Sequence, residues 1–299
     1  MHFLGAISIS TAYLYSPLFL QHQTADHPES PERLRAIMRA LADANLLSRL
    51  IALEPQPATD QQILAVHTPE HLARVTQIVE RGGGFLDPDT YTNEYSLDAA
   101  RLAAGAVIRG VDAVLQKEID NAFALVRPPG HHATTQRAMG FCLFNNIAIG
   151  AQHALDAHQL KRVLIVDYDV HHGNGTQDIF YHSPRVLYFS THQYPFYPGT
   201  GHWSETGEGA GAGYTANAPL GPFVGDDDYC RLFRDFLAPL ARRYQPQLIL
   251  VSVGYDAHWS DPLAMENLSL AGYTALARIL LEIARTVCDG RIVFVLEGG

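Results

Sequence analysis

The segment Val163-Leu164-Ile165-Val166-Asp167-Tyr168-Asp169-Val170-His171-His172-Gly173 joins an apolar run to a cluster of carboxylates and imidazoles. Its first four residues are apolar and mostly β-branched, which predicts a strand buried on both faces. Alternation along an extended chain would place Asp167, Asp169 and His171 on one face. Oxygen and nitrogen ligands crowded together are what a divalent metal requires. The segment therefore predicts a metal site where a buried strand ends.

A second candidate ligand, Asp256, lies in Gly254-Tyr255-Asp256-Ala257-His258. Asp169, His171 and Asp256 would offer one nitrogen and two oxygen ligands. Three protein ligands with an open position are typical of a catalytic zinc site rather than a structural one. A single aspartate at a strand end more often only forms hydrogen bonds. Ionised groups clustered without a counter-ion repel one another, however, so the whole set favours a metal-dependent hydrolase.

Composition limits the class of protein. The chain has 299 residues, of which 47% are hydrophobic and 17% charged, as expected for a globular protein rather than a disordered or coiled-coil one. A single α/β domain can reach this length. Lysine and arginine number 21 against 31 acidic residues, a formal charge of −10. This charge disfavours nucleic acid as a partner and would attract a cationic substrate such as a lysine-bearing peptide or a polyamine.

Neither cysteines nor apolar segments indicate an extracellular or membrane protein. The three cysteines, Cys142, Cys230 and Cys288, are far apart and show no CxxC spacing, so we expect no disulfide framework and no thiolate zinc site. Residues 1–10 are apolar but lack a basic start, so we expect no signal peptide. No apolar run reaches the roughly 18 residues of a membrane span. These features predict a cytoplasmic protein without membrane contact.

The apolar pattern predicts a parallel α/β domain. Runs without polar alternation predict buried strands, and segments with helical periodicity separate them. The expected strands are 163–166, 186–190, 248–253 and 292–296, and the expected helices are 31–50, 97–116, 145–158, 229–244 and 270–287. Ligands bind such sheets beyond the carboxyl ends of the strands, where Asp167 to His171, Ser190 to His192, Asp256 and Glu297 would all lie. The glycine-rich stretch 199–213 is expected to be a functional loop.

Two further motifs permit catalysis or substrate binding. Arg127-Pro128-Pro129-Gly130-His131-His132-Ala133 presents paired histidines after a rigid turn, and a histidine can act as general base and then acid. Alone, this pair more often has a structural role. Phe196-Tyr197-Pro198-Gly199-Thr200-Gly201 could form an aromatic wall for an aliphatic stem, although packing in the core is an equally good reading.

Taken together, the motifs resemble one family. They follow its order over nearly the whole chain: His27 to Arg33, Arg127 to His132, Gly140-Phe141-Cys142, Asp167 to Gly175, Phe196 to Gly201, Gly254 to His258 with Asp261-Pro262-Leu263, and Leu296 to Gly299. The chain is similar to the zinc-dependent histone deacetylase and acetylpolyamine amidohydrolase superfamily, in particular to its class II-like bacterial members.

The resemblance implies a fold and a catalytic centre. The fold would be an arginase/deacetylase-like three-layer α/β fold with a central eight-stranded parallel sheet. Asp169, His171 and Asp256 would bind zinc. His131 and His132 would flank the metal-bound water, with His132 as proton shuttle. Asp167 would orient His131, and Asn174 would lie behind His132. Channel residues would be Gly140, Phe141, Phe196, Tyr197 and Leu263.

Other ligands also follow from the resemblance. A structural potassium ion would use Asp167, Ser190 and Thr191 with nearby backbone carbonyls. A second potassium site would draw on the backbone around Phe180, Ser183 and Val186. The substrate would be an acyl-lysine peptide or an acylated polyamine that loses its acetyl group. The oligomeric state is left open.

The family pattern continues Glu297-Gly298-Gly299 with a tyrosine that also holds the oxyanion. We therefore expect residues 1–299 to form a single deacetylase-like domain truncated at its C-terminus. Two alternatives stay open. One is a catalytically impaired module that binds acyl-lysine or a partner. The other is an arginase-like binuclear manganese hydrolase, which would need more carboxylate ligands than the motifs offer.

Overall fold

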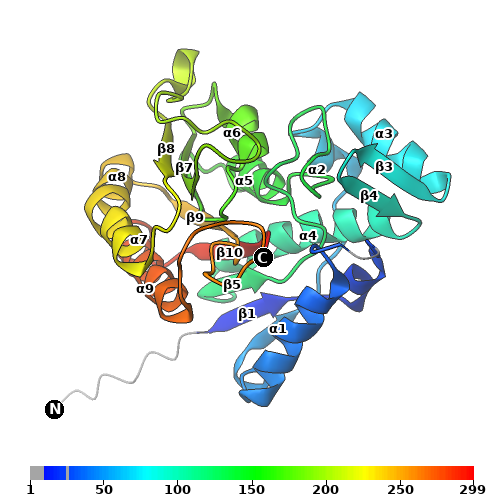
Figure 1. Cartoon of the computed structure of the whole chain (residues 1–299), viewed down its shortest axis with the longest axis horizontal. Helices are drawn as coiled ribbons and strands as arrows, with labels where there is room; N and C mark the ends of the chain where they lie inside the picture. Colours follow the sequence, from blue (N-terminus) through cyan, green and yellow to red (C-terminus); the bar gives the residue numbers. More distant parts are fainter. Residues whose placement is uncertain (1–9, 25–26) are drawn as a thin grey trace.

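The computed structural model describes residues 10–24 and 27–299, in which eight parallel strands form one sheet between layers of helices (Figure 1). The strand order is β2-β1-β5-β10-β9-β6-β7-β8, and every neighbouring pair is parallel. The strands are β1 (Thr11–Leu14), β2 (Ile51–Leu53), β5 (Asn121–Ala124), β6 (Val163–Asp167), β7 (Val186–Gln193), β8 (Thr215–Leu220), β9 (Leu248–Val253) and β10 (Ile292–Leu296). The expected eight-stranded parallel sheet is confirmed.

The helices cover both faces of the sheet, and the strands are apolar for that reason. Figure 1 shows α7 (Asp226–Leu232), α8 (Ala238–Tyr244) and α9 (Leu270–Cys288) gathered on one side, whereas α4 (Ser96–Leu115) and α5 (Asn146–Asp156) pack against the other. Val163 and Ile165 of β6 point into the core beneath α4 and α5, while Leu164 and Val166 point into the core beneath α7 to α9. Side chains alternate, but both sides are buried, so the run shows no polar alternation.

The remaining elements connect these layers. The main helices are α1 (Pro31–Asp43), α3 (Pro69–Glu80), α4 (Ser96–Leu115), α5 (Asn146–Asp156), α7 (Asp226–Leu232), α8 (Ala238–Tyr244) and α9 (Leu270–Cys288). The shorter ones are η1 (Pro17–Gln21), η2 (Leu47–Arg49), α2 (Asp60–Leu64), α6 (Asn174–Phe180), η3 (Gly209–Gly211) and the π-helical turn η4 (Phe233–Leu237). A separate antiparallel hairpin consists of β3 (Gly83–Asp87) and β4 (Thr90–Asn93).

The first helix is shorter than its apolar pattern predicts. It begins at Pro31 after the N-cap Ser30, as expected, but ends at Asp43 rather than residue 50. Asn45 has a φ of 53°, in the left-handed region, and the N–H of Leu46 donates to the carbonyl of Leu41. This hydrogen-bonded closure ends the helix, and the apolar periodicity continues only as a 3₁₀ turn.

The predicted helix 229–244 is also interrupted. It begins earlier, at Asp226, and its middle turn, η4, is π-helical. Pro239 lies in the first turn of α8, directly after that segment. Because proline lacks an N–H and its ring displaces the carbonyl of the preceding turn, the helix widens there instead of continuing regularly.

Two expectations about strand ends are wrong. Strand β7 continues to Gln193, so Ser190 to His192 lie within it rather than beyond its end, because β8 pairs with it as far as Leu220. Strand β6 ends at Asp167, so Asp169 and His171 do not alternate along a strand with it. The site residues after β6 are instead placed by a loop.

In the described ranges, 10–24 and 27–299, the helices are all too short or too polar to cross a membrane. The prediction that residues 1–10 are no signal peptide falls almost wholly outside the described residues. The cytoplasmic location stays a prediction.

Candidate active site

The chain curls tightly where β6 ends at the carboxyl edge of the sheet. The N–H of Asp169 donates to Oδ1 of Asp167 at 3.2 Å, and the N–H of His171 donates to Oδ1 of Asp169 at 2.9 Å. Aspartate side chains commonly close such local turns by accepting from the backbone two residues on. This loop brings the three side chains together within a few residues.

Asp256, which follows β9, completes a cluster with Asp169 and His171. One ligand atom from each of the three residues lies within 4.8 Å of the other two. Nδ1 of His171 is 3.2 Å from Oδ1 of Asp169 and 3.1 Å from Oδ2 of Asp256. Both carboxylates are buried. The structure thus brings the three predicted zinc ligands into one group.

Two glycines leave space for this group. A Cβ at Gly254 would lie 2.4 Å from Oδ2 of Asp169, and a Cβ at Gly298 would lie 2.6 Å from Oδ2 of Asp256. The backbone can therefore approach the carboxylates closely, and the N–H of Gly298 donates to Oδ2 of Asp169 at 2.9 Å. The N–H of Val170 donates to Oδ1 of Asp256, also at 2.9 Å. These bonds hold the carboxylates in position.

The electrostatics of the cluster favour a cation. Burial, together with the neighbouring Asp169 charge, raises the pKa of Asp256 to about 6. Burial would lower the pKa of His171, but hydrogen bonds to Asp169 and Asp256 outweigh it and raise the pKa to about 10. Two buried carboxylates this close together are stabilised only by positive charge between them.

The paired histidines lie beside the cluster, each with a different partner. Nδ1 of His131 is 3.1 Å from Oδ2 of Asp167, and Nδ1 of His132 is 2.8 Å from Oδ1 of Asn174. The two rings are 4.0 Å apart between centroids. The amide oxygen of Asn174 can only accept, so Nδ1 of His132 carries the proton and its Nε2 is a free base.

The same surroundings shift the two histidines in opposite directions. Burial lowers the pKa of His131, but the carboxylates of Asp167 and Asp169 outweigh it and raise the pKa to about 10. Burial and the neighbouring His131 and His171 hold the pKa of His132 well below its usual value. One imidazole is therefore cationic and the other neutral at neutral pH, which is the division an acid–base site needs.

Glu297 supports this loop, although the sequence motifs did not give it a role. Its Oε2 accepts from the N–H groups of Gly130 at 2.7 Å and His131 at 3.1 Å, and its Oε1 accepts from Oγ of Ser252 at 2.9 Å. Burial raises its pKa to about 7. The sequence placed it at the end of a predicted strand and within the motif Leu296 to Gly299, but neither observation gave it a role.

A second buried carboxylate, Glu29, was likewise missed. Nη2 of Arg127 donates to its Oε2 at 2.7 Å, and Nε of Arg127 donates to its Oε1. Arg33 donates to the same carboxylate at 3.2 Å and to the carbonyl of Glu297 at 2.6 Å. These contacts anchor the start of the histidine loop to the segment before α1.

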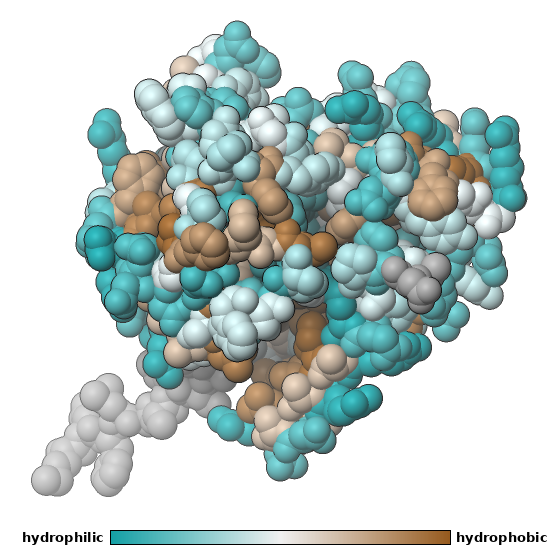
Figure 2. Space-filling model, viewed as in Figure 1, coloured by the Kyte–Doolittle hydropathy of each residue, from teal (hydrophilic) through white to brown (hydrophobic). Residues whose placement is uncertain are grey.

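A cavity of about 210 Å³ opens onto the cluster and the histidines. The walls are contributed by residues far apart in sequence, among them Pro28, Arg33, Pro129, His131, His132, Gly140, Phe141, Asp169, His171, Asp256, Asp261, Leu263 and Gly298. Figure 2 shows hydrophobic surface gathered around the centre of the face on which β10 ends. The cavity can accept a slender, largely apolar group.

Of the five predicted channel residues, three line the cavity and two contact the histidine rings. Gly140, Phe141 and Leu263 line the cavity. Phe196 stacks on the ring of His171 at 5.5 Å between centroids, and Tyr197 meets His132 edge-on at 5.2 Å. The aromatic pair thus lies against the imidazoles of the site.

The residues predicted to hold potassium are adjacent across β6 and β7. Asp167 and Ser190 are register partners, and Thr191 follows on β7. Oγ of Ser190 is 2.9 Å from Nδ1 of His192. Oγ1 of Thr191 is buried and has no hydrogen-bond partner among the described residues. For the second predicted site, the N–H of Ser183 donates to the carbonyl of Phe180 at 2.9 Å.

Comparison with known proteins gives consistent results. Residues 27–299 match the family described as "Histone deacetylase domain". The chain is 43% identical over 292 residues to the "Probable deacetylase" of Archaeoglobus fulgidus, covering 97% of this chain and 81% of that protein. It is 41% identical over 276 residues to the "Histone deacetylase-like amidohydrolase" of Pseudomonas aeruginosa, covering 92% and 73%. The solved structure titled "Crystal Structure of HDA15 HD domain" superposes with a TM-score of 0.93 at 41% identity, covering 98% of this chain and 83% of that one.

Proposed function

The chain belongs to the histone deacetylase family, and on this basis we propose that it is a zinc-dependent amidohydrolase that removes an acetyl group from an acylated primary amine. The amine would be an acyl-lysine side chain or an acylated polyamine. The observation that carries the proposal is the convergence of Asp169, His171, Asp256 and the two histidines on one cavity.

The donor set fits zinc. Two carboxylates and one imidazole can reach a common ion, and the cavity leaves room for water and substrate. When bound there, zinc would polarise the amide carbonyl and lower the pKa of a water molecule. The three-ligand group also favours a single ion over the binuclear manganese alternative, which would need further carboxylates.

We assign the proton transfers to His132. Its neutral Nε2 takes the proton of the attacking water, whose oxygen bonds to the amide carbon. As the carbon–nitrogen bond breaks, the same nitrogen returns the proton to the leaving amine. The cationic His131, held by Asp167, stabilises the negative charge that develops on the carbonyl oxygen. The adduct collapses to acetic acid and the amine, and the proton of the acid passes to the more basic amine, so that the products are acetate and the ammonium form of the amine.

Potassium would occupy the first of the two predicted potassium sites. Asp167, Ser190 and Thr191 are hard oxygen donors, and the unpartnered Oγ1 of Thr191 is the atom that a bound cation would satisfy. Because Asp167 also holds His131, this ion would tie the histidine to the sheet.

A fluorogenic acetyl-lysine peptide and an acetylated polyamine, each with added zinc, test the proposal. We expect His132→Ala to lower turnover by about 10²- to 10⁴-fold while zinc and hydroxamate still bind. The matched control is His182→Ala, because the His182 side chain is 69% exposed. Asp256→Ala should abolish binding of both zinc and hydroxamate at the site.

Two outcomes would contradict the proposal. Full zinc-dependent turnover in His132→Ala would contradict the proton transfers assigned to His132. Full turnover in Asp256→Ala would contradict its assignment as a zinc ligand. Hydroxamate binding by the unchanged chain without turnover of any acylated amine would instead support a module that only binds acyl-lysine.

A further inference from the structure

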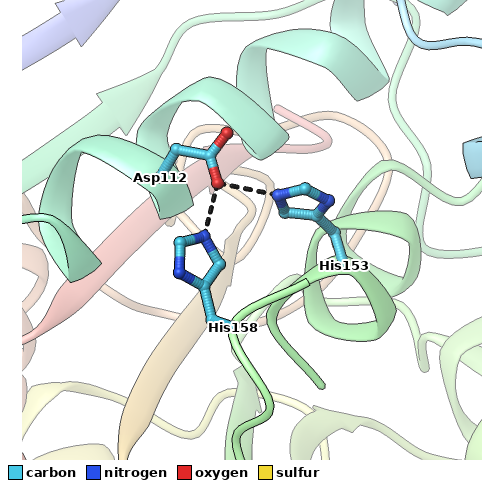
Figure 3. A group of neighbouring side chains, drawn as sticks. All are labelled: Asp112, His153 and His158. Atoms are coloured by element: carbon cyan, nitrogen blue, oxygen red, sulfur yellow. Dashed lines mark hydrogen bonds and ion pairs between the residues drawn. The ribbon is translucent and has the colours of Figure 1, made fainter. Parts of the chain in front are cut away.

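A second group of potential metal ligands lies away from the active site. Oδ1 of Asp112, on α4, is 2.7 Å from Nε2 of His153 and 2.6 Å from Nε2 of His158. Figure 3 shows both imidazoles pointing at the same carboxylate oxygen, one from α5 and one from the turn after it. One ligand atom from each residue lies within 4.8 Å of the other two.

This group lies near the amino-terminal ends of the strands, whereas the active site lies at their carboxyl ends. Helix α5 begins beside the histidine loop, where Nδ2 of Asn145 donates to the carbonyl of Ala133 at 3.1 Å. It ends near the start of β6, whose other end carries Asp167. His153 is in its last turn, so the length of the helix separates the two groups.

The backbone holds the three side chains in place without a metal. Helices α4 and α5 approach closely at Gly150, where a Cβ would lie 2.4 Å from Cγ1 of Val107. The turn after α5 is closed by the N–H of Leu160, which donates to the carbonyl of Ala154 at 3.2 Å. Nη2 of Arg185 braces it further by donating to the carbonyls of Leu155 and Leu160.

The donor chemistry is that of a borderline transition metal. Two imidazole nitrogens and a carboxylate oxygen suit Zn²⁺ and its neighbours rather than Ca²⁺ or Mg²⁺. Bonds of about 2.0–2.2 Å would place the donor atoms about 3–3.5 Å apart, so the imidazoles need to retreat by only about half an ångström. The side chains of His153 and His158 are 15% and 20% exposed, and His153 borders a cavity of about 410 Å³ from which water can complete the coordination.

The nitrogen atoms of both imidazoles already converge on one carboxylate oxygen of Asp112. A metal ion would therefore enter between donor groups that the fold has already brought together.

We propose that Asp112, His153 and His158 form a second transition-metal site, of the Zn²⁺ class, that clamps α4 to the turn between α5 and β6. The proposal does not depend on the proposed function. A bound ion would link three segments across 46 residues of sequence and stabilise the folded chain by its binding free energy.

Zinc bound per chain, measured by mass spectrometry after removal of excess metal, tests the proposal. We expect two zinc ions in the unchanged chain and one in His158→Gln. The matched control His182→Gln, at an exposed histidine, should retain two. In Asp256→Ala, which lacks a ligand of the active site, one zinc ion should remain and should raise the melting temperature.

Asp112→Asn provides a variant that keeps a hydrogen-bond acceptor for both imidazoles. If the group is a metal site, this change should weaken zinc binding in the Asp256→Ala background by at least about 10-fold, while circular dichroism stays unchanged.

The outcomes separate the two metal proposals. Equal zinc content in the unchanged chain and His158→Gln would overturn the second site, as would a dissociation constant in the millimolar range. Loss of one zinc ion in His158→Gln but none in Asp256→Ala would support the second site and contradict the active-site ligands.

Discussion

Replacing Glu29 by glutamine should destabilise the whole fold, although Glu29 also borders the active-site cavity. Its carboxylate is the counter-charge of Arg127, which is fully buried and also donates to the carbonyl of Phe19 at 2.9 Å. Glutamine keeps the shape but removes the charge. The guanidinium then remains buried without an anion, and it cannot lose its proton.

Two estimates of the cost agree. Breaking a buried ion pair by removing one partner costs about 3–5 kcal/mol. Burial would raise the pKa of Glu29, but Arg127 outweighs it and lowers the pKa from 4.5 to about 2. This difference corresponds to about 3 kcal/mol. For 299 residues the unfolding entropy is about 0.6 kcal/mol/K, so the melting temperature should fall by about 5–8 °C.

The pH dependence gives an independent check. Because the folded pKa of Glu29 is lowered, its contribution is complete above pH 4.5 and is lost as the pH falls towards about 2. The difference in the free energy of unfolding between the unchanged chain and Glu29→Gln should therefore be largest near neutral pH. It should shrink as the pH falls below about 4.5.

Urea unfolding followed by circular dichroism measures this difference. The control is Glu32→Gln, three residues further along, because the Glu32 side chain is 71% exposed and pairs with Arg35 in the next turn. The control should change the free energy of unfolding by less than about 0.5 kcal/mol. If both variants lose the same stability at pH 7, the buried pair does not have the assigned role.

Three further predictions concern the site and the buried histidines. Gly140→Ala should lower turnover by about 100-fold with zinc binding intact, because its Cβ would lie 2.4 Å from the His132 ring. Gly221→Ala, where a Cβ meets nothing within 4 Å, is its control, and equal turnover in both would refute the steric argument. Removing zinc with a chelator should lower the free energy of unfolding by about 3 kcal/mol for each bound ion if zinc was present at a hundredfold excess over the dissociation constant of that site; an unchanged urea midpoint would count against a tightly held ion. Burial lowers the pKa of both His22 and His192 to about 4, so stability present above pH 6.5 should be lost as the pH falls towards 4. Each residue should account for about 2 kcal/mol between pH 7 and pH 5, measured as the change over that range in the difference in free energy of unfolding between the unchanged chain and His22→Gln or His192→Gln; a difference that stays constant would show that the replaced histidine is not buried neutral.

The parts of the fold that could be predicted are those in which local composition decides the outcome. Strands 248–253 and 292–296 begin and end as their apolar runs do, because every residue of a central parallel strand is buried or nearly so. Strands β1, β2, β5 and β8 were not found from their own pattern. β1, β2 and β5 have only three or four residues, and the missed strands include exposed or polar residues such as Ile51 and Asn121. Only pairing with neighbours makes them strands.

Helix ends could likewise be predicted only where residues close in sequence determine them. The start at Pro31 was readable, since a serine and a proline act within one turn. The end at Asp43 was not, because apolar residues continue past it and a single left-handed residue, Asn45, stops the helix.

In the candidate site, the sequence likewise revealed the chemical groups of some residues but not the partners of the buried charges. Asp169 and His171 were recognisable because two ligand types stand two residues apart after a buried run. The sequence did not predict that Glu29 is buried against Arg127, 98 residues away. It also did not predict that Glu297 is buried against Gly130, 167 residues away. Neighbouring residues in the sequence show which chemical groups a segment carries. The partner of a buried charge depends on which distant segments pack against each other in the fold. The amino-acid order thus specifies which groups can bind a metal and carry a proton, and the packing of the sheet and its helices decides which of them meet.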